Sequence, residues 1–139
     1  MREAIVILPC NGIGNPLSTI SRYAAYEAAR LLREDGIEAE LLAIGRLLAR
    51  LEDAVQRARA AKLAVIEGCY ARCASKLLET LGVPVAAYVY VPDVMQACGI
   101  GLRGIDRKSL GPKGKALVDS VARATADAVR ALAASAGEA

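Results

Sequence analysis

Four cysteines are the residues of this sequence best suited to chemistry. Cys10 follows a short apolar run at residues 4–8, near the start of the chain. Cys69 and Cys73 follow a second such run at residues 63–66. Runs this short, without polar alternation, are typical of strands buried on both faces of a parallel sheet. Open α/β sheets bind their ligands beyond the carboxyl ends of such strands. The sequence therefore predicts a thiol site at one edge of a sheet.

The spacing of Cys69 and Cys73 leaves two kinds of chemistry open. If both residues lie in a helix, their Cβ atoms are about 5–6 Å apart, whereas a disulfide needs roughly 3.5–4.5 Å. That spacing suits a shared zinc ion, whose sulfur ligands each lie about 2.3 Å from the metal. If Cys69 lies outside the helix, a disulfide becomes possible. The chain has no histidine, so a metal site must use thiolate and oxygen ligands.

Cys98 is the candidate for a fourth ligand. It follows the expected fourth strand, and Gly99 and Gly101 would let the chain fold back over the other cysteines. Four thiolates would make a closed, structural zinc site, whereas three would leave a position for water or substrate. We predict zinc ligands from the set Cys10, Cys69, Cys73 and Cys98, and we favour the open site without Cys98.

Two other functions fit the same stretches of sequence. A thiol-dependent redox or sulfur-transfer enzyme would use Cys10 or Cys69 as the attacking thiol. Glu67 would then act as a general base, or else simply cap a backbone N–H group. A small-anion site would use the glycine-rich loop Asn11–Asn15, whose backbone could approach a ligand closely. Basic residues further along the chain would assist it, namely Arg103, Arg107 and Lys108.

Alternating apolar runs and helical stripes position these residues. Strands are predicted at 4–8, 38–44, 63–67 and 85–91. Helices are predicted to about residue 34, at 46–61, after Gly68 and from about 112, with a short helical turn at 93–98 and a mobile loop over most of 99–115. This alternation predicts one three-layer α/β/α domain over residues 1–139, with a four-stranded parallel sheet of order 2-1-3-4. The first and last helices would share one face of the sheet.

The amino-acid composition limits the kinds of partner that we expect for this protein. No apolar run approaches the roughly 20 residues of a membrane span, and the start of the chain does not resemble a signal peptide. We therefore expect a cytoplasmic protein whose cysteines serve as thiols or metal ligands. Net charge is only +3 and tryptophan and phenylalanine are absent, which argues against nucleic acid. The expected partners are a metal ion and a small anionic or thiol-containing ligand.

Two segments carry a resemblance to a known family. PCNGIGNPLSTISRYAAYEAARLL and IEGCYARCASKLLETLGVPV resemble the DGC-domain family, whose zinc binding is inferred from its cysteines. That family pairs a Pro-Cys-x-Gly-Ile-Gly segment with a central Asp-Gly-Cys-x-x-x-Cys-Ala. Cys10, Cys69 and Cys73 match motif cysteines, and Glu67 replaces the motif aspartate. The resemblance implies a zinc-binding site and supplies no established reaction.

Overall fold

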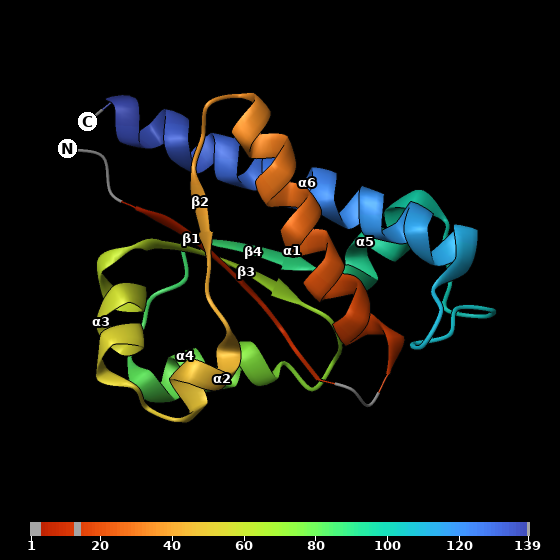
Figure 1. Ribbon diagram of the computed structural model, residues 1–139, viewed down its shortest axis with the longest axis horizontal. Coiled ribbons are helices and arrows are strands. Elements are labelled where there is room, and N and C mark those ends of the chain that lie inside the picture. Colours follow the sequence, from red (N-terminus) through yellow and green to blue (C-terminus); the bar gives the residue numbers. More distant parts are fainter. Residues whose placement is uncertain (1–3, 13–14, 139) are drawn as a thin grey trace.

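A four-stranded sheet lies between two layers of helices in the computed structural model, which describes residues 4–12 and 15–138 (Figure 1). The strands are β1 (Ile5–Pro9), β2 (Ala39–Leu41), β3 (Lys62–Glu67) and β4 (Ala87–Tyr90). The helices are α1 (Pro16–Glu34), α2 (Ile44–Leu48), α3 (Glu52–Ala60), α4 (Cys73–Leu81), α5 (Val91–Cys98) and α6 (Gly111–Glu138).

The sheet has the predicted parallel order, β2-β1-β3-β4. β1 and β3 form its centre, and Leu8 of β1 pairs with Val65 of β3. All five residues of β1 and all but the first residue of β3 are buried. This burial on both faces explains why the two central strands read as unbroken apolar runs. The edge strands β2 and β4 are shorter and partly exposed.

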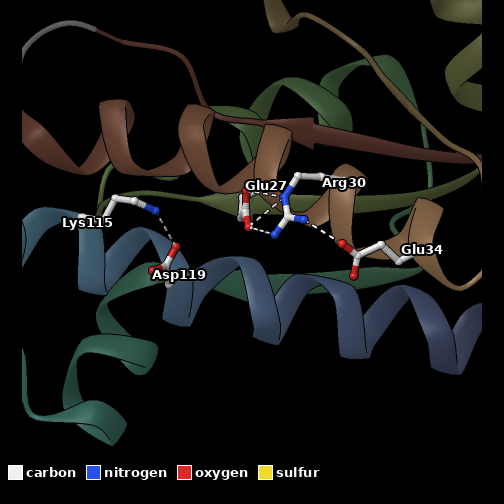
Figure 2. A network of polar contacts seen from close by, with 5 residues as sticks. All are labelled: Glu27, Arg30, Glu34, Lys115 and Asp119. Carbon is white, nitrogen blue, oxygen red and sulfur yellow. Dashed lines mark hydrogen bonds and ion pairs between the residues drawn. The ribbon is translucent and has the colours of Figure 1, made fainter.

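The helices divide between the two faces as the sequence predicts. Ile7 of β1 points into a core shared with α1 and α6, while Val6 and Leu8 point into a second core with α2, α3 and α4. α1 and α6 run side by side over the first face (Figure 1). Figure 2 shows their charged side chains, with Glu27, Arg30 and Glu34 on α1 and Lys115 and Asp119 on α6.

Three elements differ most from the prediction. The helix predicted at 46–61 is two helices, because the chain turns at Arg50, whose φ of 58° is left-handed. The second strand ends at Leu41. The fourth strand ends at Tyr90, since Val91 and Pro92 open α5, and proline suits a first helical turn. All three differences lie where an apolar run continues past the end of its element.

The segment between α5 and α6 is tied to the body of the protein. Ile105 is buried in the core beneath α6, and Leu102 and Leu110 pack against that core. Asp106 and Ser109 form an isolated bridge that closes a tight turn. Within the described part of the chain, no helix is both long and apolar enough to cross a membrane.

Candidate thiol site

Three of the four cysteines line one cavity of about 230 Å³. Cys10 follows β1 directly and Cys69 follows β3 after one residue, so both lie beyond the carboxyl ends of neighbouring strands, as predicted. Cys73 is the first residue of α4. The remaining lining residues are Asn11, Gly12, Ser18, Ile44 and Leu48. The fold therefore collects thiols from two strand ends and one helix at the point where the strand order reverses.

Cys10 is the buried member of the group, with 8% of its surface exposed. The Gly68 N–H donates to Cys10 Sγ at 3.2 Å, and the Ser21 and Ser18 hydroxyl oxygens lie 3.5 Å and 4.0 Å from the same sulfur. Burial raises the pKa of the Cys10 thiol above its ordinary value of 9.0, and the nearby charge of Glu67 adds to this. The three hydrogen bonds oppose the shift without reversing it. At neutral pH Cys10 is therefore a protonated thiol.

Gly68 lets the turn after β3 pass close to Cys10. A Cβ atom at this position would lie 2.8 Å from Cys10 Sγ and 3.1 Å from the carbonyl oxygen of Leu17. Real Cβ atoms do not approach other atoms within 3.0 Å, and the 3.1 Å contact, itself tight, is with the backbone of α1. The glycine is thus required for close packing between the two loops that carry thiols.

Glu67 caps α4 from the sheet. Its carboxylate is 1% exposed and accepts hydrogen bonds from the N–H groups of Ala74, at 3.3 Å, and Ser75, at 3.1 Å. These are among the N–H groups that a helix start leaves without a partner. The residue at the N-cap position, Arg72, makes no such bond with its side chain. Of the two roles considered for Glu67, the structure shows the cap.

Cys69 lies outside α4, in the turn that precedes the helix. The N–H of Arg72 donates to the Cys69 carbonyl at 3.1 Å, and Arg72 itself adopts a left-handed backbone with φ 52°. The spacing of a fully helical pair therefore does not apply to Cys69 and Cys73. Both are free thiols, as are Cys10 and Cys98.

Arg72 rests on two tyrosines of β4, an arrangement that the sequence analysis missed. Its guanidinium donates to the Tyr88 hydroxyl at 3.0 Å and lies 4.3 Å from the centre of the Tyr90 ring. The two rings stack with their centres 6.2 Å apart. Partial burial raises the pKa of Tyr88 above its ordinary value. Tyr88 and Tyr90 are two residues apart in the sequence, a spacing that places both rings on one face of a strand. This spacing could have predicted a shared contact for the two rings.

Cys98 does not line the thiol cavity. It ends α5, is exposed, and its thiol lies 3.8 Å from the carbonyl oxygen of Met95. Its role as a zinc ligand stays a prediction. Across the described residues, no group of three or more cysteine, aspartate or glutamate side chains is arranged as a metal site. Cys10, Cys69 and Cys73 thus border a common space without already forming a coordination shell.

The glycine-rich loop is described only in part, because Ile13 and Gly14 lie outside the described residues. The Asn15 side chain caps α1 by accepting a hydrogen bond from the Leu17 N–H at 2.9 Å. Asn11 is exposed and lines the thiol cavity. The anion site proposed for this loop from the sequence remains a prediction.

Comparison with family models matches residues 6–101 to the DGC domain. The chain belongs to the DGC family. The matched segment contains every residue that lines the thiol cavity, and it also contains Cys98. No curated protein and no solved structure matches the chain.

Proposed function

We propose that this DGC domain binds a zinc ion through Cys10, Cys69 and Cys73. The observation that carries the proposal is their shared cavity, into which three different segments bring sulfur. Thiolate sulfur is a preferred ligand of zinc, and the absence of histidine leaves thiolates as the soft ligands of this chain. Zinc would act here as a Lewis acid or as a structural link between the two strand ends.

Binding would require the thiols to close around the ion, because their present arrangement is not a metal site. The chain offers freedom for this movement. Cys69 lies in a turn outside regular structure, and the Cys73 side chain is exposed at the first position of α4. Cys10 is held more firmly by Gly68 and Ser21. We therefore assign Cys10 as the fixed ligand toward which the other two move.

Each thiol must lose its proton to hold zinc, so metal affinity should fall as the pH is lowered. Burial holds the pKa of Cys10 above its ordinary value, so zinc must displace a firmly held proton at this ligand. Three thiolates would leave the fourth tetrahedral position open, since Cys98 lies outside the cavity. Such a site would present the metal to water or to a small ligand.

The test is the zinc content of protein purified without chelators or affinity metals. One equivalent is expected in the wild type, and Cys10→Ser, Cys69→Ser and Cys73→Ser should each lose most of it. Cys98→Ser is the matched control and should keep its zinc. Equal zinc loss in all four variants would replace the open site by a four-cysteine site. Absence of zinc from the wild type, even after incubation with zinc at neutral pH, would overturn the proposal.

A second candidate function is reversible thiol–disulfide exchange between Cys69 and Cys73. The position of Cys69 outside α4 favours it, because the pair is not held at helical spacing. Closing the disulfide would transfer two electrons and release two protons to an oxidised thiol partner. Mild oxidation of metal-free protein should then remove two titratable thiols, and a dithiol should restore both. The Cys69→Ser variant, which lacks one member of the pair, should lose no titratable thiol under the same treatment.

A further inference from the structure

A second cavity, of about 210 Å³, lies beside the thiol cavity at the same edge of the sheet. It sits beyond the ends of β1 and β2, against the second and third turns of α1. Its lining residues are Pro9, Asn11, Arg22, Ala25, Tyr26, Leu41, Leu42 and Ala43. Asn11 lines both cavities, so the two spaces adjoin at this residue. Ligands of open α/β sheets bind along this edge.

Arg22 is the charged residue of the second cavity, and it is half-buried. Within the described residues it pairs with no carboxylate, and its guanidinium lies 5.3 Å from the centre of the neighbouring Tyr23 ring. The contrast is with five other arginines that form ion pairs with acidic side chains, namely Arg30, Arg33, Arg46, Arg57 and Arg130. An anion in the cavity would supply the opposite charge that Arg22 does not receive from the described residues.

The other lining groups indicate which anion fits. The Asn11 amide and the Tyr26 hydroxyl can each donate a hydrogen bond, and a guanidinium can bind both oxygens of a carboxylate. The walls contributed by Ala25, Leu41 and Leu42 are apolar. The volume corresponds to about seven water molecules at roughly 30 Å³ each. A carboxylate with a short apolar chain matches this combination of charge, walls and size.

We propose that Arg22 and Asn11 bind the carboxylate of a small organic acid in this second cavity. The ligand extends past Asn11 toward the thiol cavity, so its far end meets the cysteines. This inference goes beyond zinc binding and does not require it, because the anion site uses none of the three thiols. It gives the DGC domain a substrate class, a short-chain carboxylate, whose reactive end would face the thiols or their metal.

The test is an NMR titration of the full chain in its reduced, metal-free form with two probes of similar shape. Butyrate carries the carboxylate and butyramide is its neutral counterpart. Butyrate should shift the Arg22 Nε–H and Asn11 side-chain signals saturably and bind at least about tenfold more tightly than butyramide, since bonds to charged groups are the stronger ones. Arg22→Gln should abolish this preference. Arg33→Gln, on the same helix and exposed, should retain it.

Equal binding of the two probes, or a preference for butyrate that survives Arg22→Gln, would overturn the proposal. Tighter binding of inorganic phosphate than of butyrate at the same signals would also overturn the carboxylate assignment. Thermal unfolding of both variants confirms that they remain folded. Because the titration contains no metal, its failure would leave the zinc measurement unaffected. Conversely, a protein without zinc affinity should still bind butyrate.

Discussion

The groove between α1 and α6 and the thiol cavity differ in size and in chemistry. The groove has a volume of about 510 Å³, more than twice that of the thiol cavity. Its charged lining residues are Glu27, Arg30 and Lys115. Arg30 pairs with Glu27 and Glu34, and Lys115 pairs with Asp119, so these charges are satisfied within the protein (Figure 2).

The thiol cavity is smaller and its groups are less satisfied. Cys69 and Cys73 are free thiols at its wall. The Cys10 sulfur accepts a hydrogen bond from the Gly68 N–H and shares its own proton with the hydroxyl oxygens of Ser18 and Ser21. Judged by volume alone, the groove would be the better candidate for a binding site. Judged by its lining groups, the thiol cavity at the strand ends is the better candidate, because a ligand or metal there would supply interactions that the protein does not supply itself.

We expect the largest loss of stability from replacing Glu67, whose carboxylate caps α4 and so supports the thiol cavity. Glu67→Ala leaves the Ala74 and Ser75 N–H groups without their buried acceptor and should cost about 3 kcal/mol in the free energy of unfolding. Glu67→Gln, with one acceptor oxygen, should fall between it and the wild type. Urea denaturation measures both.

The control for Glu67 is Glu79→Ala, an exposed residue of the same helix, which should change stability by less than about 0.5 kcal/mol. Equal losses in the Glu67 and Glu79 variants would mean that the buried carboxylate does not support α4.

Gly68→Ala should cause the second-largest loss of stability, because its methyl group would collide with Cys10 and with the backbone of α1. The expected loss is about 2 kcal/mol in the free energy of unfolding, with reduced zinc affinity because the two thiol loops are pushed apart. Gly45→Ala is the matched control, since a Cβ there meets nothing within 4 Å. An unchanged Gly68→Ala variant would show that the loops are not closely packed.

The pH dependence of stability should also show the effect of burying the Cys10 thiol. Its pKa is raised in the folded protein, so the folded state holds this proton more tightly than the unfolded state does. The resulting stabilisation is complete below the ordinary thiol pKa of 9.0 and is lost as the pH rises above it. Cys10→Ala should flatten this part of the stability profile, whereas Cys98→Ala should not. Identical profiles for the two variants would contradict the burial of Cys10.

The smallest loss of stability should come from a substitution in the groove between α1 and α6. Arg30 lowers the pKa of Glu27, mainly by hydrogen bonding, so Glu27 stabilises the fold above its ordinary pKa of 4.5 and loses this effect as the pH falls. The pair is partly exposed, so Glu27→Gln should lower the urea midpoint only slightly at neutral pH and low salt. High salt should remove most of that difference. A large, salt-independent loss would give the groove a role that its paired charges do not suggest.

The central part of the fold could be predicted from the sequence because β1 and β3 are buried on both faces and their composition reflects it. Their order also placed Cys10 and Cys69 on neighbouring strand ends. The break at Arg50 could not be predicted, because the apolar stripe continues through Leu48 and Leu51, which are 61% and 43% exposed.

The features that could not be predicted depend on contacts between segments that are distant in the sequence. The Glu67 cap and the Arg72–tyrosine contact depend on how the turn after β3 meets α4 and β4. The need for glycine at position 68 comes from Cys10 and α1, both more than 40 residues away in sequence, and not from its own backbone conformation. The adjoining cavity at Arg22 likewise requires β1, β2 and α1 to be assembled. Local sequence patterns do not encode these contacts.

X-ray absorption at the zinc edge tests the central claim most directly, because it counts the sulfur atoms bound to the metal. Zinc-loaded wild-type protein should show three sulfur neighbours at about 2.3 Å and one lighter oxygen or nitrogen neighbour. Cys98→Ser should give the same spectrum. A shell of four sulfurs that drops to three in Cys98→Ser, or a shell with no sulfur, would contradict an open site formed by Cys10, Cys69 and Cys73.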